Sequence, residues 1–172
     1  LYNMALKQNQ VGDFVGSETT TIQAIERLKP INKYRQLYGC YDNLAIVSSE
    51  LGDYDRALQY YDQSLFYLKK MNDPKFMVTN HINNLSNVYL IKGDYEQASK
   101  NFSQVLNTDS LQLKDPKLYA KALNNLALSK IRQKDTSGTK VLIQKSIKIK
   151  DSLNDKQSLA SSYFTLAEYN LF

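Results

Sequence analysis

The chain has 172 residues, of which 42% are hydrophobic and 23% charged, a composition typical of a globular domain rather than of a disordered segment. No apolar run approaches the roughly 18 residues that a membrane-spanning helix needs. The net charge of +5 comes from 22 basic and 17 acidic residues spread over the whole chain. The densest basic run, 140–150, alternates with apolar residues as a solvated amphipathic helix would. We therefore expect this domain to bind neither nucleic acid nor membranes.

Helical spacing of apolar residues recurs along the entire chain. It predicts helices over 1–11, 17–28, 31–51, 54–71, 74–92, 95–108, 116–133, 136–152 and 156–172. Pro30 separates the second helix from the third. Asp73 with Pro74 and Asp115 with Pro116 are start signals, because Asp caps a helix and Pro fits its first turn. The longest irregular piece is expected at 109–115.

The corner between two of these helices has a sequence that returns at a fixed distance. LGDYDRALQYY, from Leu51, reappears from Lys92 as KGDYEQASKNF, so that Gly93 follows Gly52 by 41 residues. A step of 40 residues back from Gly52 reaches Gly12, and a step of 41 residues forward from Gly93 reaches Lys134. Glycine can end a helix in the left-handed conformation, and the following Asp can cap the next helix. A period of about 40 residues predicts a stacked repeat architecture.

Two details of these corners give further expectations. Asp94 and Gln97 have the spacing of a capping box, in which the Gln side chain would bind the N–H of the cap residue. The corner at 134–138 lacks glycine at its first position, so its geometry is expected to differ from that of the others.

The spacing of large and small residues resembles the tetratricopeptide repeat family. The best copies are Tyr41, Leu44, Ala45, Ser48, Ala57 and Tyr61, and then Ile82, Leu85, Ser86, Tyr89, Ala98 and Phe102. A weaker copy contains Leu123, Leu126 and Ala127, and partial copies contain Leu1, Met4 and Ala5, and Tyr163, Leu166 and Ala167. The period exceeds the usual 34 residues of the family and resembles the long-repeat type found in kinesin light chains and bacterial regulatory proteins.

This resemblance implies an all-α, right-handed solenoid of antiparallel helix pairs in one domain over 1–172. Its repeats would be 1–30, 31–72, 73–114 and 115–154, followed by a half repeat at 155–172. The chain begins inside a predicted helix, and the apolar positions of its last helix lack a following partner helix. We therefore expect a piece of a longer protein, and a homo-oligomer formed through the terminal helices is a further expectation. The 13 tyrosines are expected to fill the core and the groove wall.

The sequence contains no pattern that indicates catalysis. There is no glycine-rich phosphate loop and no metal-ligand cluster. The single His81 and the single Cys40 occupy the same position of consecutive repeats, but two ligands are too few for a structural zinc site. We expect no cofactor, no metal and no enzymatic activity.

One series of polar residues exceeds what helix packing requires. Asparagine recurs at one position of the first helix of each repeat, where it is a poor helix former. The series is Asn3, Asn43, Asn84 and Asn125, and neighbouring groove candidates are Asn83, Asn87, Asn124, Lys121 and Leu128. Helical periodicity places these residues opposite the buried ones. In the resembling family, an asparagine ladder on this inner face holds the backbone of an extended peptide, whereas repeat duplication alone would also copy an ancestral asparagine.

These features predict a noncatalytic module that binds a peptide or protein segment in its inner groove. The expected setting is the sensory or regulatory arm of a larger bacterial signalling protein. The alternative is an assembly scaffold whose groove holds a helix of another subunit or of its own C-terminal extension.

Overall fold

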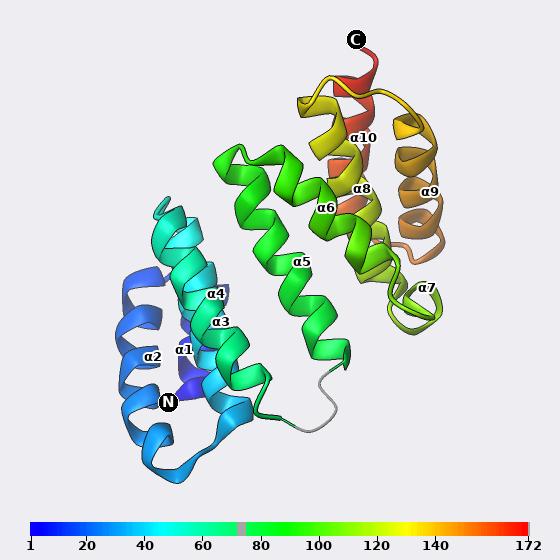
Figure 1. Ribbon diagram of the computed structural model, residues 1–172. Coiled ribbons are helices and arrows are strands. Elements are labelled where there is room, and N and C mark those ends of the chain that lie inside the picture. Colours follow the sequence, from blue (N-terminus) through cyan, green and yellow to red (C-terminus); the bar gives the residue numbers. More distant parts are fainter. Residues whose placement is uncertain (72–74, 172) are drawn as a thin grey trace. The chain divides into compact units, whose positions relative to one another are not determined.

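The computed structural model describes residues 1–71 and 75–171, and in these residues it contains helices and no β-strand (Figure 1). Contacts divide the chain into two compact units, Leu1–His81 and Ile82–Phe172, and the division falls inside one helix. The predicted all-α, tetratricopeptide-like fold is confirmed.

Unit 1 consists of two packed helix pairs and the start of a further helix. α1 packs on α2, α3 packs on α4, and α2 and α1 also contact α3. The elements are α1 (Tyr2–Gln10), α2 (Phe14–Leu28), the 3-10 helix η1 (Lys29–Ile31), α3 (Tyr34–Glu50), α4 (Tyr54–Leu68) and the beginning of α5 (Lys75–Lys92). The predicted start signal at Asp73 and Pro74 lies outside the described residues. Pro30 lies in η1, which separates α2 from α3 as predicted.

Unit 2 contains the rest of α5 and the helices that follow it (Figure 1). α8 contacts α6, α7, α9 and α10, and α9 also packs against α10. The elements are α6 (Tyr95–Leu106), α7 (Leu111–Lys114), α8 (Pro116–Arg132), α9 (Thr139–Ser152) and α10 (Lys156–Tyr169). α8 is therefore the central helix of this unit.

The glycine corners form as the sequence predicts. Gly12, Gly52 and Gly93 have φ values of +81°, +82° and +92°, in the left-handed region that favours glycine. The next residue then caps the following helix: an Asp53 side-chain oxygen accepts a hydrogen bond from Arg56 N at 3.0 Å, and Asp94 caps α6 in the same way. Local chemistry alone therefore accounts for these turns.

The predicted capping box at Asp94 does not form. The Asp94 N–H instead donates to Tyr89 O at 2.9 Å, within the corner itself. The Gln97 side chain is thereby released and donates to Asn101 Oδ1, one turn along α6. The left-handed corner already satisfies the backbone group that a capping box would serve.

The corner after α8 differs from the others, as expected from its missing glycine. Lys134 takes the left-handed conformation in place of glycine, with φ of 62°. Gly138, with φ of 67°, then precedes α9 without a side-chain cap. α9 accordingly begins at Thr139, three residues later than the sequence predicted.

The stretch expected to be irregular at 109–115 contains a short helix, so that expectation was wrong in part. α7 forms one helical turn there, and Leu111 within it is buried. Leu111 joins a core cluster with Phe102, Val105 and Leu118. Burial of the apolar Leu111 side chain stabilises the ordered turn in this connection.

The small residues of the repeats lie where the resemblance places them. Ala45 and Ala57 are fully buried in unit 1. Ser86, Ala98 and Ala127 are fully buried in unit 2. Large side chains fill the space beside them, including Tyr61 in unit 1, which is 2% exposed. Helices can approach closely at these positions because no larger side chain intervenes.

His81 and Cys40 are both buried in unit 1. The His81 ring lies against Tyr61, with ring centroids 5.5 Å apart, and its Nδ1 is 3.4 Å from Ser64 Oγ. Burial lowers the pKa of His81 to about 4 and raises that of Cys40 to about 12. Both side chains therefore act as packing residues at neutral pH.

None of the helices in the described ranges is long and apolar enough to cross a bilayer.

Candidate functional site

The asparagine series is divided between the two units and has no common environment. Asn3 is exposed on α1, where it lines a shallow pocket of about 460 Å³ together with Met4 and Lys7. Asn43 is only 2% exposed. Asn84 and Asn125, both in unit 2, are partly buried. Repeat position therefore does not decide the exposure of these side chains.

Asn43 is part of the core of unit 1, contrary to its predicted position opposite the buried face. Its Nδ2 donates to Ser17 Oγ and to Thr21 Oγ1, each at 2.9 Å. Its Oδ1 accepts from Asn9 Nδ2 at 2.8 Å. The side chain thus joins α3 to both α1 and α2. These partners occupy the polar groups of Asn43, so we leave it out of the candidate site.

In unit 2, asparagines of α5 and α8 form two hydrogen-bonded groups. Asn124 is 3% exposed and its Nδ2 donates to Asn125 Oδ1 at 3.3 Å. Asn125 Nδ2 in turn donates to Asn87 Oδ1 on α5 at 2.7 Å. Asn83, 1% exposed, makes a similar but longer contact with Asn84 Oδ1, at 3.4 Å. We call Asn83, Asn84, Asn87, Asn124 and Asn125 the asparagine cluster.

The asparagine cluster presents oriented amide groups at a partly buried surface. Asn84, Asn87, Asn125 and the nearby Leu128 are all partly exposed, while Asn83 and Asn124 lie beneath them. Each side-chain carbonyl oxygen can accept two hydrogen bonds. Asn84 and Asn125 can therefore keep their internal bond and accept another from a ligand N–H.

A pocket of about 560 Å³ in unit 2 brings two predicted residues together with others that the sequence reasoning missed. Lys121 and Asn125, one turn apart on α8, are the predicted ones. The wall is completed by Asp115, Lys117 and Leu118 of the same helix region, by Lys150 of α9, and by Asp155, Ser158 and Ser161 at the start of α10. Desolvation lowers the pKa of Lys121 although the residue is exposed overall.

Lys150 is buried, contrary to the prediction for its helix face. It belongs to the basic run 140–150, which was expected to be a solvated face, yet it is 3% exposed. Its Nζ donates to Ser158 O at 3.0 Å, to Ser162 Oγ at 2.7 Å and to Ser161 Oγ at 3.3 Å. Desolvation lowers its pKa to about 8.

A signal for this burial was present in the sequence. Lys150 follows the buried Ile143 by seven residues and the buried Ser146 by four, which is the spacing of one helix face. The charge of a lysine normally argues against burial. Three serine oxygen partners on α10 supply the hydrogen bonds that make burial tolerable here.

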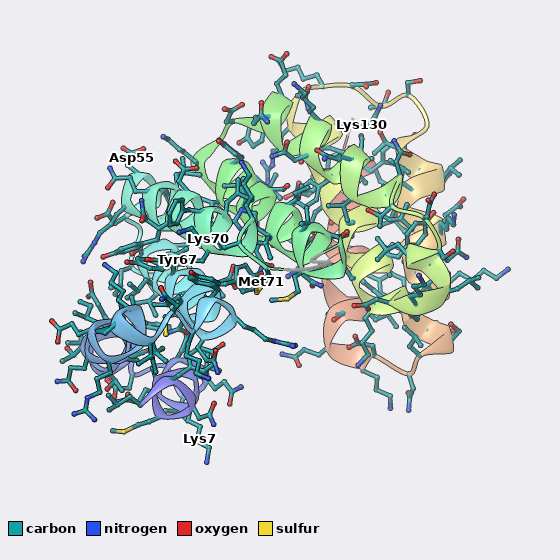
Figure 2. All side chains as sticks on the ribbon, turned by 60° about the horizontal axis from the view of Figure 1, so that its bottom comes forward. Lys7, Asp55, Tyr67, Lys70, Met71 and Lys130 are labelled. Atoms are coloured by element: carbon teal, nitrogen blue, oxygen red, sulfur yellow. The ribbon has the colours of Figure 1, made fainter. Side chains whose placement is uncertain are left out.

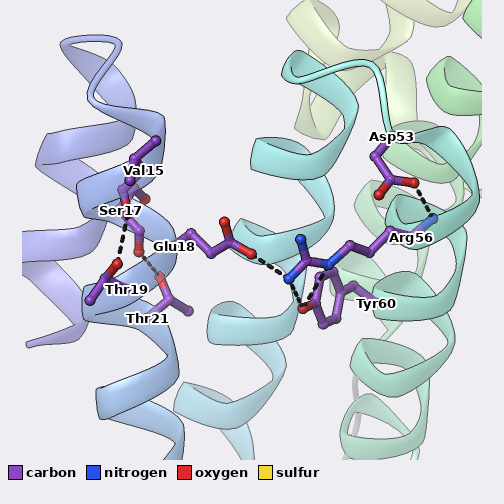
Figure 3. A network of polar contacts seen from close by, with 8 residues as sticks. All are labelled: Val15, Ser17, Glu18, Thr19, Thr21, Asp53, Arg56 and Tyr60. Atoms are coloured by element: carbon purple, nitrogen blue, oxygen red, sulfur yellow. Dashed lines mark hydrogen bonds and ion pairs between the residues drawn. The ribbon is translucent and has the colours of Figure 1, made fainter.

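Unit 1 has polar and aromatic contacts of a different kind. Arg56 forms an ion pair with Glu18 and donates through Nη2 to the Tyr60 hydroxyl at 3.0 Å, connecting α2 with α4 (Figure 3). Tyr67 stacks on Tyr41 with ring centroids 5.5 Å apart. Figure 2 labels Lys70 beside Tyr67 near the end of α4. The Lys70 ammonium group lies 4.3 Å from the Phe66 ring centroid. Tyr67 of α4 thus contacts α3 through Tyr41, and the side chains of Arg56 and Lys70 lie over the rings of Tyr60 and Phe66.

Comparisons with known proteins identify the repeats. Tetratricopeptide repeat models match residues 39–65 and 82–110. No curated protein matches the sequence. Among solved structures, the apo form of the quorum sensor NprR from B. thuringiensis is 24% identical with a TM-score of 0.81, over 99% of this chain and 47% of NprR. This chain thus spans about half the length of NprR.

Two further structures share the fold. NprR in complex with its cognate peptide NprX is 24% identical with a TM-score of 0.74, over 96% of this chain and 47% of that one. A putative kinesin light chain with nearly identical repeats from Podosopora anserina is 14% identical with a TM-score of 0.72, over 97% and 85% of the two chains. Residues 39–65 and 82–110 are thus tetratricopeptide repeats, and the chain around them has the same fold.

Proposed function

We propose that this domain is a noncatalytic module that binds an extended peptide or protein segment, and that unit 2 provides the main contact surface. The observation that carries the proposal is the asparagine cluster. Asn125 of α8 is held by hydrogen bonds with Asn124 and with Asn87 of α5. Asn84 of α5 accepts one from the buried Asn83. Ordered amides of this kind bind a peptide backbone at a lower entropic cost than free side chains would.

An extended segment suits these groups because its backbone offers regularly spaced N–H and C=O groups. Asn84 and Asn125 would contact the backbone, and Asn87, Leu128 and Lys121 would select among side chains. The structural likeness to NprR, which has been solved with its cognate peptide, supports this assignment. We further propose that the domain is the sensory or regulatory arm of a larger bacterial signalling protein, by analogy with that quorum sensor.

The test is the double variant Asn84→Ala with Asn125→Ala, compared with Asn107→Ala. Asn107 is an exposed asparagine at the end of α6 and outside the asparagine cluster. Peptides selected from a displayed random library on the unmodified domain serve as probes, and binding is measured by fluorescence anisotropy. We expect the double variant to lose about 1 to 3 kcal/mol of binding free energy, from two neutral hydrogen-bonding side chains, and Asn107→Ala to lose none.

The melting temperature separates binding from folding in this experiment. Alanine is the better helix former, so the double variant should melt within a few degrees of the unmodified domain. Unchanged peptide affinity in the double variant would contradict the proposal. A large fall in melting temperature would show that these asparagines serve the fold, and would favour the scaffold alternative.

A further inference from the structure

Lys150 is a buried amine whose hydrogen-bond partners, in the described part of unit 2, are all uncharged. It is 3% exposed, and its Nζ donates to Ser158 O, Ser161 Oγ and Ser162 Oγ. Removal of an ammonium group from water disfavours its charged form. Burial accordingly lowers the pKa of Lys150 to about 8. A lysine of this kind spends part of its time as a neutral amine, which is a nucleophile.

Two of the three oxygens around Lys150 act only as acceptors. Ser158 contributes a backbone carbonyl, which has no proton to give. Ser146 donates its hydroxyl proton to Ala120 O at 2.8 Å. In the 3.1 Å contact between Ser146 and Ser162, the Ser162 hydroxyl is therefore the donor. Because its proton is used there, the Ser162 oxygen is left to accept from Lys150 at 2.7 Å.

The third oxygen, Ser161 Oγ, can serve both protonation states of the lysine. Its distance from Lys150 Nζ is the longest of the three, at 3.3 Å, and Ser161 is exposed whereas Ser162 is buried. The Ser161 hydroxyl donates to Ser158 O at 2.7 Å, and rotation about its Cα–Cβ bond would direct the same proton to a neutral amine. The lone pair of the neutral amine would then point toward Ser161.

This side of the amine meets the pocket of about 560 Å³, which Ser161 and Lys150 both line. The charged side chains around the pocket, besides Lys150, are Asp115, Lys117, Lys121 and Asp155. Besides burial, the charge of Asp155 raises the pKa of Lys150 and that of Lys121 lowers it. Both aspartates cap helices, since Asp115 accepts from Leu118 N and Asp155 from Ser158 N.

We propose that Lys150 is a carbamylation site, at which the neutral amine reversibly binds carbon dioxide. The Nζ lone pair attacks the carbon of CO₂ and forms an N–C bond, while the electron pair of one C=O π bond moves to oxygen. One N–H proton then leaves to water in the pocket. The products are a carbamate anion and one proton, so that atoms and charge balance without an oxidant or a reductant.

The groups around Lys150 can satisfy the carbamate. Its one remaining N–H would donate to Ser162 Oγ, and Ser158 O would keep its bond from Ser161. The two carbamate oxygens would extend into the pocket, where the exposed Lys121 is available as a cation. The repulsion between Lys121 and the Lys150 ammonium group would thereby become an attraction.

The small exposed fraction of Lys150 is the reason to assign CO₂ rather than a larger electrophile. A linear molecule of three atoms needs little access, and it reacts without a leaving group. The site goes beyond the proposed function and does not depend on it, because no bound segment takes part in the reaction. Failure of one therefore leaves the other in place.

The test is a titration of the domain with ¹³C-labelled bicarbonate, followed by ¹³C NMR. At about pH 7.5, about a quarter of Lys150 is neutral because its pKa is about 8, against about 0.1% of a lysine with the usual pKa. The N-terminus is acetylated, since an α-amino group titrates in the same range. Lys150→Met removes the amine, and Lys148→Met is the matched control, an exposed lysine on the same helix.

We expect one saturable carbamate signal that disappears when CO₂ is removed. Lys150→Met should abolish this signal and Lys148→Met should keep it. Lys121→Met should weaken CO₂ binding about twofold to fivefold, the range of an accessible ion pair. At a fixed concentration of dissolved CO₂, the signal should grow as pH rises from 7 through 8, because more of the Lys150 amine is neutral.

Trapping of the carbamate by alkylation, followed by mass spectrometry, locates it on the unmodified chain. This measurement decides the matter even if Lys150→Met alters folding. Absence of a carbamate at Lys150 would overturn the inference. Equal occupancy of Lys148 and Lys150 would also overturn it, since the signal would then reflect the ordinary reactivity of lysines. So would a signal that persists in folded Lys150→Met.

Discussion

Replacing Asn43 by alanine tests the structural role of the one asparagine of the series that is fully enclosed. The variant removes three hydrogen bonds of 2.8 to 2.9 Å, to Asn9, Ser17 and Thr21. Each contributes about 0.5 to 1.5 kcal/mol net, and the buried hydroxyl groups lose a partner. The better helix propensity of alanine offsets about 0.5 kcal/mol. We expect the free energy of unfolding to fall by about 2 to 4 kcal/mol.

The assay is urea unfolding followed by circular dichroism, with Asn84→Ala as the matched control. Asn84 has the same repeat position but is only partly buried, so its replacement should change the unfolding free energy by less than about 1 kcal/mol. A loss below about 1 kcal/mol for Asn43→Ala would refute the reasoning. Equal losses for the two variants would do so as well.

Three further predictions concern acid stability, the corners and one ion pair. The pKa of His81 is lowered from 6.5 in the unfolded chain to about 4 in the folded one. As pH drops from 6.5 toward 4, the unfolded state therefore binds the proton first, and the free energy of unfolding falls by up to about 3 kcal/mol. His81→Gln should flatten this part of the stability profile, and an unchanged slope would contradict the prediction. Gly52→Val should cost about 1 to 3 kcal/mol in thermal unfolding because of its positive φ, whereas Lys134→Gly should gain up to about 1 kcal/mol at the same kind of position; the opposite signs would disprove the corner geometry. A double-mutant cycle on Glu18 and Arg56, an accessible pair, should give a coupling of about 0.2 to 1 kcal/mol that weakens with salt, and a larger coupling would indicate a more enclosed contact.

The corners and the close-packing positions could be predicted from the sequence because their causes are local. Gly52 and Asp53 determine a turn through their own backbone and side-chain chemistry, whatever lies around them. Ala45 and Ala57 mark places where helices meet, because a small residue returns at each of these positions in the next repeat. The missed one-turn helix α7 is different, since it depends on Leu111 reaching a core built by α6 and α8.

The environment of the polar side chains was decided only by the tertiary structure. Asn43 and Asn125 have the same repeat position, yet Asn43 is enclosed because Ser17 and Thr21 of α2 happen to offer it acceptors. Lys150 is buried because serines of α10, eight to twelve residues further along the chain, accept its hydrogen bonds. The period of a helix tells which residues share a face. Whether that face meets solvent, a hydrogen-bond partner or a pocket depends on residues that only folding brings near. This is why the burial and the partners of the predicted asparagines emerged only from the structure.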